Sequence, residues 1–229
     1  YSGLPARLVS AHPILGIAYA LRLRFGRRGH DPRSTFMWAG DRLADYALRD
    51  GIGRSGTIYA YASAAARVFK SVDASQCHRI LEQPSAPVQF ELELADEERD
   101  KWPGLENMPG TRWVCECRER ETLEWNLAHC IVCPSDFVRE EAVRYGADPS
   151  KCHVVPYGVD LPADVAPRIV HTEGVFRVLF VGSIRLLKGV QYLAEAARQL
   201  LDAPVRIRMV GPLLCNQERF MRMLPPNVE

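Results

Sequence analysis

One stretch, residues 176–201, constrains the fold more than any other part of the chain. Its sequence is FRVLFVGSIRLLKGVQYLAEAARQLL. Nearly all of its first six residues are apolar, a pattern typical of a parallel strand that is covered on both faces. After Gly189 the apolar residues recur at helical spacing, which predicts a helix that buries one face. The stretch is therefore predicted to form a strand, a short loop and a helix, the repeating unit of an α/β fold.

The loop between this strand and this helix carries two cations, Arg185 and Lys188. Free backbone N–H groups at the start of a helix favour an anion, and the two side chains add full positive charge beside them. Together these groups favour a diphosphate. The loop matches neither GxGxxG nor GxxxxGK[ST], so neither a dinucleotide fingerprint nor a Walker loop is supported. The loop alone leaves open an ordinary turn with two solvated cations.

Length and composition are those of a folded protein with one large or two modest domains. The chain has 229 residues, 47% of them hydrophobic and 25% charged, and its formal net charge is +1. This charge does not suggest a nucleic-acid partner. No apolar run approaches the roughly 20 residues that a membrane-spanning helix requires, and the first residues show no signal-peptide pattern.

The seven cysteines are an odd number. Without a secretory signal, this count indicates free thiols in a reducing compartment, so we expect a cytoplasmic location. The spacings CEC at 115–117 and CIVC at 130–133 suggest zinc at first sight. However, Cys115 and Cys117 fall in a predicted helix, about 200° apart around its axis. Cys130 and Cys133 fall in a predicted strand and face opposite sides. We therefore expect no metal site.

The rest of the chain alternates predicted helices and strands. Helices are predicted within residues 11–30, 35–50, 63–72, 88–102 and 112–129, and after Ser135. Strands are predicted at residues 57–61, 78–84, 130–133 and 205–211, and residues 152–160 are predicted to form a strand that runs into a turn. The segment 161–174 contains prolines and has no periodicity, so it is predicted to be an interdomain linker. This leaves a first domain at 1–160 and a second at 175–229.

Residues 11–30 combine an apolar helical segment with four arginines towards its end, at positions 22, 24, 27 and 28. Two interpretations stay open. The segment is either a packing helix of the first domain or an interfacial helix that touches anionic lipid. The second interpretation would add peripheral contact with the inner face of a membrane.

Three motifs occur in order along the chain, EWNLAHCIVCPSDFV, VVPYGVD and VGSIRLLKGVQYLAEAA, and the last of them lies within the stretch 176–201. Each resembles a landmark of the family-four GT-B glycosyltransferases, which are retaining enzymes that use nucleotide sugars. LEQPSAP and the WPG region at 102–104 resemble the first domain of one subgroup. The resemblance covers residues 57–211. It departs from the family at Ser183, where the family has Arg, and at His129, where it has Asp.

The resemblance implies an α/β, GT-B-like fold with two Rossmann-like parallel sheets facing a cleft. It implies transfer of a hexose, with retention, from a UDP- or GDP-linked donor to a hydroxyl of a carbohydrate, lipid-linked or other acceptor, without a cofactor or metal ion. The donor diphosphate is expected at Lys188 and Arg185, where Gly182, Ser183 and Gly189 would let the backbone approach. Gly211 and Pro212 are expected near the nucleotide.

On the acceptor side, Glu82 and Ser135 are candidates, because ligands of open α/β sheets sit beyond the carboxyl ends of strands. Glu82 could bind a sugar hydroxyl, although a solvated side chain is the favoured interpretation. Ser135 is predicted to cap the following helix. Glu121 and Glu124 lie on the apolar face of their predicted helix and need partners, for which an arginine is the favoured choice over a catalytic role.

The family carries a pair of glutamates in a later segment of its second domain, after the part that this chain matches. The chain is therefore expected to be an internal piece with an incomplete second domain, poorly packed over 175–229 and inactive by itself. Two alternatives stay open. One is a non-catalytic GT-B-like binding or assembly module, and the other is a different nucleotide-binding enzyme, such as a sugar-nucleotide epimerase.

Overall fold

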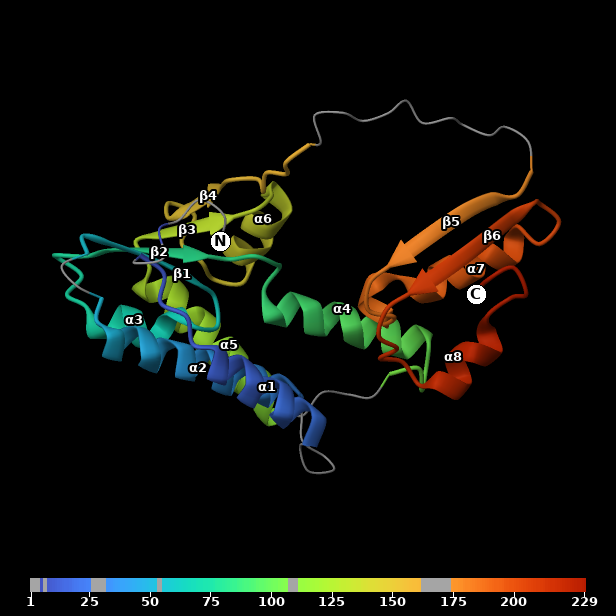
Figure 1. The fold of residues 1–229 in the computed structure, drawn as a ribbon. Coiled ribbons are helices and arrows are strands. Elements are labelled where there is room, and N and C mark those ends of the chain that lie inside the picture. The colour runs from blue at the N-terminus through green and yellow to red at the C-terminus, as the bar shows by residue number, and fades with distance from the viewer. Residues whose placement is uncertain (1–4, 6–7, 26–31, 53–54, 107–110, 162–173) are drawn as a thin grey trace. The chain divides into compact units, whose positions relative to one another are not determined.

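The computed structural model describes residues 5, 8–25, 32–52, 55–106, 111–161 and 174–229, and the statements below concern these residues. The chain forms two compact units (Figure 1). The first comprises Tyr1–Phe90 and Pro109–Tyr157, and the second Glu91–Met108 and Gly158–Glu229. Nearly all of the predicted linker lies outside the described residues, and the predicted domain boundaries stay predictions.

The first unit is built on a four-stranded parallel sheet in the order β1-β2-β3-β4. Its strands are β1 (Thr57–Tyr61), β2 (His78–Glu82), β3 (Cys130–Cys133) and β4 (Cys152–Val154). The connections carry helices α3 (Ala65–Ser71), α4 (Val88–Lys101), α5 (Thr111–Leu127) and α6 (Asp136–Arg144). Since all four strands are parallel, their carboxyl ends lie at one edge of the sheet.

Two helices precede the sheet, α1 (Pro13–Phe25) and α2 (Pro32–Asp50), in agreement with the sequence pattern. They lie side by side (Figure 1), and the guanidinium of Arg22 sits 4.0 Å from the ring centroid of Trp38. Residues 26–30 of the predicted basic segment, including Arg27 and Arg28, lie outside the described residues. No helix among the described residues is both long and apolar enough to cross a membrane.

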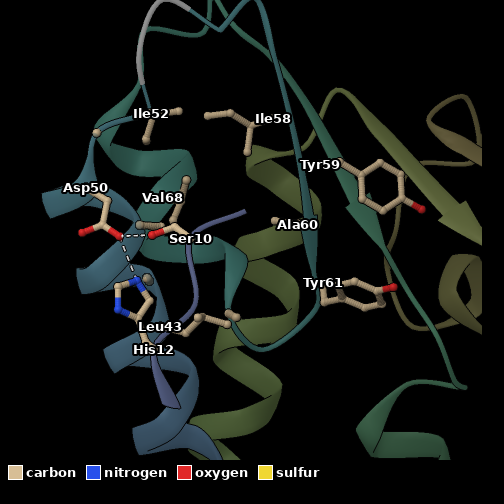
Figure 2. A pocket seen from close by; sticks show the side chains of 14 residues that line it. Ser10, His12, Leu43, Asp50, Ile52, Ile58, Tyr59, Ala60, Tyr61 and Val68 are labelled. Carbon is tan, nitrogen blue, oxygen red and sulfur yellow. Dashed lines mark hydrogen bonds and ion pairs between the residues drawn. The ribbon is translucent and has the colours of Figure 1, made fainter. Parts of the chain in front are cut away.

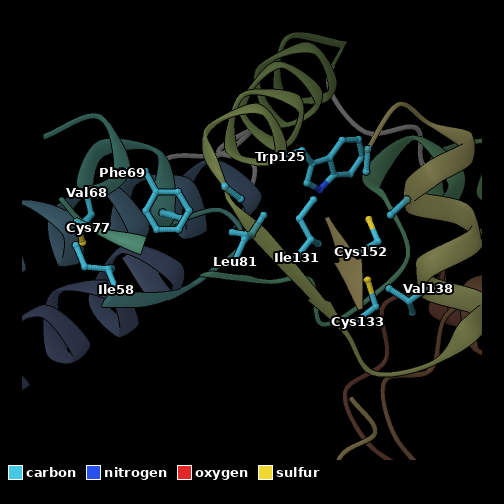
Figure 3. Packing of buried hydrophobic residues seen from close by; sticks show 14 of the residues in the cluster. Ile58, Val68, Phe69, Cys77, Leu81, Trp125, Ile131, Cys133, Val138 and Cys152 are labelled. Atoms are coloured by element: carbon cyan, nitrogen blue, oxygen red, sulfur yellow. The ribbon is translucent and has the colours of Figure 1, made fainter. Parts of the chain in front are cut away.

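The core of the first unit lies between the sheet and its helices (Figure 3). Leu81 and Ile131 project from the strands and are fully buried, while Phe69 of α3 and Trp125 of α5 meet them from the helix side. Cys133 belongs to this core as an apolar residue, and burial raises the pKa of its thiol to about 12. The described residues contain no group of three or more His, Cys, Asp or Glu side chains placed to hold a metal ion.

The second unit contains a two-stranded parallel sheet, β5 (Phe176–Val181) and β6 (Val205–Val210). A 3-10 turn, η2 (Leu186–Lys188), and helix α7 (Val190–Gln199) follow β5, and α8 (Gln217–Met223) follows β6. The α/β class with parallel sheets is confirmed.

Strand β5 differs from its prediction, because it is covered on one face only. Val178 and Phe180 are partly buried, whereas Leu179 and Val181 are 63% and 72% exposed. The exposed pair lies on one face of the strand and the partly buried pair on the other, because side chains alternate along a strand. A nearly continuous apolar run predicts burial on both faces only when both faces receive a helical layer.

The second unit has a core that sequence reasoning did not foresee. Its buried members are Leu105, Ile184, Leu186, Val190, Cys215 and Phe220. Leu105 comes from the segment after α4, far away in sequence, and its carbonyl accepts the backbone N–H of Asn216 at 2.7 Å. The expectation that 175–229 packs poorly left out this contribution from residues 91–106.

Candidate functional site

The loops that follow β5 and β6 run alongside each other. The N–H of Gly182 donates to the carbonyl of Val210 at 3.0 Å, and the N–H of Ile184 donates to the carbonyl of Pro212 at 2.9 Å. The N–H of Leu214 returns to the carbonyl of Ile184 at 3.0 Å. These bonds bring the predicted backbone residues of the donor site together at the carboxyl edge of the second sheet.

Gly211 is required where these loops meet. Its φ is 153°, and a Cβ at this position would lie 1.8 Å from the carbonyl oxygen of Gly182. No real Cβ makes such a contact, so a side chain here would force the two loops apart. Gly211, which the family resemblance places near the nucleotide, therefore has a packing role of its own.

Lys188 and Gly189 lie where η2 ends and α7 begins. Gly189 adopts the left-handed conformation, with φ 69° and ψ 20°, and its N–H donates to the carbonyl of Leu186 at 2.9 Å. The side chain of Lys188 is exposed, and no carboxylate of a described residue lies within ion-pair distance of it. Because the first N–H groups of α7 have no partner within the helix, positive charge gathers at this end.

Arg185 immediately precedes η2 and is partly buried. Its Nε atom is enclosed and has no hydrogen-bond partner in the part of the chain that the structure describes. The guanidinium therefore keeps one unused N–H, at an atom that is closed to solvent in this structure. The structure therefore places Arg185 and Lys188 at opposite ends of one short 3-10 turn, together with Gly182, Ser183 and Gly189.

Two carboxylates also reach this turn, and sequence reasoning missed both. Oε1 of Glu106 accepts the backbone N–H of Leu186 at 2.5 Å. Glu98 accepts the side-chain N–H of Gln191 and the hydroxyl of Tyr192, each at 2.8 Å. The partners are 80, 93 and 94 positions apart. The acidic composition of 88–102 was the only sequence signal for Glu98, and Glu106 lies outside that segment.

The charge state of Glu98 follows from these contacts. Burial favours its neutral form, but hydrogen bonds from Lys101, Tyr192 and Gln191 outweigh burial and bring its pKa below the ordinary value. Glu98 is therefore ionised at neutral pH.

The amino end of η2 already accommodates one carboxylate, that of Glu106, which demonstrates that its geometry suits an anionic oxygen.

Glu82, the acceptor-side candidate, is not solvated, and the favoured interpretation of its side chain is wrong. It is only 4% exposed. Its Oε2 accepts the hydroxyl of Tyr59 at 2.7 Å, and its Oε1 accepts the hydroxyl of Tyr157 at 2.5 Å. Tyr157 is 75 positions away in the VVPYGVD motif. The general tendency of glutamate to be exposed, on which the expectation was based, gives no information about a partner so far away in sequence.

Ser135 performs the predicted capping role. It is the N-cap of α6, and its hydroxyl accepts the N–H of Val138 at 3.3 Å. Asp136 follows in the first turn, where negative charge is favourable. Capping accounts for Ser135 without any contact to an acceptor, and its acceptor-side role stays a prediction.

Glu121 and Glu124 each serve the start of another helix through backbone N–H groups, and the positive charge of Arg120 lies near Glu124. Glu121 accepts the backbone N–H of Val88 at 3.1 Å, where α4 begins. Glu124, fully buried, accepts the N–H groups of Ser63, Ala65 and Ala66 at the start of α3. Burial raises the pKa of Glu124, against the lowering effect of these N–H groups and of nearby Arg120.

A cavity of about 420 Å³ lies beside β1 in the first unit (Figure 2). Its lining is mostly apolar, from Leu43, Ile52, Ile58 and neighbouring residues. At one side Ser10 and His12 both contact the carboxylate of Asp50, at 2.6 and 2.8 Å. A hydrolytic relay needs the histidine between serine and aspartate. Here both bind the same aspartate oxygen, so the three residues do not form a catalytic triad.

The structure is that of an α/β protein in which a 3-10 turn flanked by Arg185 and Lys188 lies at the carboxyl edge of the second parallel sheet. Residues 102–162 match the model of Glycosyltransferase Family 4. A D-inositol 3-phosphate glycosyltransferase of Pseudarthrobacter chlorophenolicus is 35% identical over 130 residues, which are 50% of this chain and 31% of that protein. Its namesake in Geodermatophilus obscurus is 39% identical over 90 residues, or 34% of this chain and 20% of that protein.

These matches confirm the resemblance of the chain to family-four glycosyltransferases. The chain spans about a third or less of each of these relatives. The activity and substrates of the whole protein are therefore treated as proposals below.

Two solved structures are distant likenesses. An Arabidopsis thaliana protein in complex with UDP-L-rhamnose is 16% identical, with a TM-score of 0.41. The match includes 97% of this chain and 51% of that protein's chain. A UDP-glucosyltransferase of Polygonum tinctorium is also 16% identical, with a TM-score of 0.34, and is covered over 54% by 98% of this chain. At these scores the likeness carries no weight for the site.

Proposed function

We propose that the whole protein is a glycosyltransferase that moves a hexose from a nucleotide diphosphate sugar to an acceptor hydroxyl. The donor diphosphate binds at the turn between β5 and α7. As the glycosidic bond to the phosphate breaks, negative charge grows on the diphosphate. Groups that are already in place there stabilise this charge, which lowers the barrier. Lys188 supplies the first charge and Arg185 the second, while the N–H groups at the start of α7 add a partial charge.

The observation that carries this proposal is the pairing of the two cations with the glycine-lined loop. Lys188 is exposed and without a carboxylate partner among the described residues, and Arg185 keeps one enclosed N–H unused. Gly211 and Gly182 let the two strand-end loops meet, so that a flat nucleotide has backbone on which to lie. The match to the glycosyltransferase family adds independent support.

The test is nucleotide binding by the 229-residue chain, measured as a shift of its melting temperature with UDP and with GDP. A ligand present at a hundred times its dissociation constant stabilises the folded state by about 2.7 kcal/mol, which is a rise of several degrees. We expect a rise with one of the two nucleotides. No rise with either nucleotide would contradict the donor site.

Three finer points of the proposal need their own measurements. Retention predicts that the product has the anomeric configuration of the donor, which NMR of the product reads directly. Metal independence predicts that EDTA leaves turnover unchanged, because Lys188 and Arg185 supply the positive charge. The choice between UDP and GDP follows from the melting experiment.

The non-catalytic alternative makes a different prediction. A binding or assembly module would bind a nucleotide or glycan without releasing a sugar. Incubating the whole protein with nucleotide sugar and acceptor, and measuring nucleotide diphosphate release, separates the two. A sugar-nucleotide epimerase would change the donor without consuming an acceptor, which NMR of the donor would reveal.

We also propose that α1 makes peripheral contact with an anionic membrane. Ile14, Ile17, Leu21 and Phe25 are spaced along one face of this helix and are 74%, 61%, 50% and 71% exposed. Arg22 and Arg24 lie in its last turn. Exposed apolar side chains beside arginines are what an interfacial helix presents to lipid.

Vesicle sedimentation tests this contact. Binding to phosphatidylcholine vesicles should rise when phosphatidylglycerol is included and should fall with added salt. The double variant Ile17→Glu/Leu21→Glu should lose binding, whereas Met221→Glu, at a residue 57% exposed on α8, should keep it. Equal sedimentation with and without the anionic lipid would contradict the contact.

A further inference from the structure

Three tyrosines gather around Glu82 at the carboxyl edge of the first sheet. Strand β1 ends at Tyr61 and strand β2 at Glu82, and these two residues are register partners. Tyr59 lies two positions before Tyr61 and therefore on the same face of the sheet. Tyr157 follows β4, and its hydroxyl reaches the same carboxylate. The edge where α/β sheets hold their ligands thus carries a carboxylate and three aromatic rings.

The carboxylate is used to hold the rings. Glu82 is 4% exposed, and each of its oxygens accepts one phenol hydroxyl, from Tyr59 at 2.7 Å and Tyr157 at 2.5 Å. The rings themselves face outward, with Tyr59 52%, Tyr61 58% and Tyr157 62% exposed. Tyr61 meets Tyr59 edge-on, with ring centroids 6.4 Å apart. A buried charge that fixes exposed aromatic side chains produces a pre-organised surface.

We propose that Tyr59 and Tyr157, held by Glu82, and Tyr61, which packs edge-on against Tyr59, form a platform that binds a carbohydrate acceptor. This inference rests on the proposed function and adds the chemical class of the acceptor. Each phenol that donates its proton to Glu82 keeps lone pairs that accept from a sugar hydroxyl. The aromatic rings offer an apolar surface to the C–H face of a pyranose. Glu82 is a positioning residue in this arrangement, since its oxygens are already occupied.

The protonation states agree with these roles. Burial, together with the hydrogen bond to Glu82, raises the pKa of Tyr59 to about 12. The pKa of Tyr157 is also raised to about 12, mainly by its own hydrogen bond to Glu82 and then by burial. Both phenols therefore stay neutral donors to Glu82 at physiological pH. Tyrosine rings also attract cations, and the tetramethylammonium competition described below distinguishes that class of ligand. The outward polar atoms are phenol oxygens, which suit a neutral, hydroxyl-rich ligand.

The test is binding of methyl α-D-glucopyranoside, methyl α-D-mannopyranoside and methyl α-D-galactopyranoside to the 229-residue chain, titrated by saturation-transfer NMR. At least one glycoside should bind. Tyr157→Phe removes one phenol oxygen and keeps the ring, so it should weaken binding about fivefold. Tyr192→Phe is the matched control, because it removes another tyrosine hydroxyl that donates to a glutamate, Glu98, in the second unit. It should leave glycoside binding unchanged.

Glu82→Gln should weaken glycoside binding more than Tyr157→Phe does, because it loosens two rings at once. Circular dichroism checks that Glu82→Gln is folded. If it is not folded, the comparison of the parent with Tyr157→Phe, a change at an exposed residue, remains the test. Absence of glycoside binding, equal affinity in the parent and Tyr157→Phe, or displacement of the glycoside by tetramethylammonium chloride would each overturn the inference.

UDP binding is measured on the same samples and separates this inference from the proposed function. If UDP raises the melting temperature and no glycoside binds, the platform is wrong and the donor site stands. If a glycoside binds in a Tyr157-dependent manner and neither UDP nor GDP binds, the platform stands and the donor site is wrong.

Discussion

Replacing Glu124 should destabilise the first unit more than any exposed change on the same helix. The side chain is fully buried in α5 and serves the start of α3. Its Oε1 accepts the N–H groups of Ala65 and Ala66, both at 3.0 Å, and its Oε2 accepts the N–H of Ser63 at 2.7 Å. Helix α3 has no side-chain cap next to it in sequence, since its N-cap is Ala64 and makes no side-chain cap bond.

The magnitude follows from the number of donors left without a partner. In Glu124→Gln the amide oxygen can keep Ala65 and Ala66, but the amide nitrogen then faces the N–H of Ser63. One buried donor is lost, which costs about 1–3 kcal/mol. In Glu124→Ala all three donors lose their acceptor and a cavity forms, so the expected loss is about 3–5 kcal/mol.

Urea unfolding followed by circular dichroism measures these losses. With a slope of about 1–3 kcal/mol per molar urea, Glu124→Ala should lower the midpoint by about 1 M or more. Glu119→Gln is the control, because Glu119 is exposed on the same helix and should change stability by about 0.5 kcal/mol or less. A Glu124→Gln midpoint equal to that of Glu119→Gln would refute the capping argument.

Two further predictions follow from contacts at the strand ends. The pKa values of Tyr59 and Tyr157, about 12 against an ordinary 10.0, predict stability that is fully present below pH 10.0 and lost as pH rises through about 12. In a phenolate absorbance titration Glu82→Gln should shift two tyrosines to lower pH, and superimposable curves would disprove the contact. Gly211→Ala should destabilise the second unit by about 2–4 kcal/mol in urea, whereas Gly158→Ala, with open space around its Cβ, should not. Equal midpoints would rule out the clash with Gly182.

Local sequence patterns predicted most of the elements. The apolar run and Gly189 placed β5 and α7 correctly, because a strand–loop–helix unit is specified within about 25 residues by periodicity and glycine conformation. Ser135 was identified as a cap for the same reason, since a cap and its N–H partner are three residues apart. The α/β class followed from the alternation of these units, whereas the two separate sheets were what the family resemblance implied.

The missed features all depend on partners far away in sequence. Glu82 looked like a solvated strand end, but Tyr157 reaches it from 75 positions away. Glu106 and Glu98 contact η2 and α7 from a segment that periodicity assigned only to an acidic helix and a turn. The open face of β5 was missed because an apolar run specifies which residues prefer burial and not whether a covering layer is present.

The most direct test of the account is the affinity of UDP and GDP for the chain with and without Lys188. Isothermal titration of Lys188→Glu should show nucleotide affinity at least tenfold weaker than that of the parent, since the variant places a negative charge beside a diphosphate. Lys70→Glu makes the same charge change at an exposed residue of α3, in the first unit, and should bind like the parent. Equal affinity in Lys188→Glu and Lys70→Glu would contradict a donor site at the start of α7.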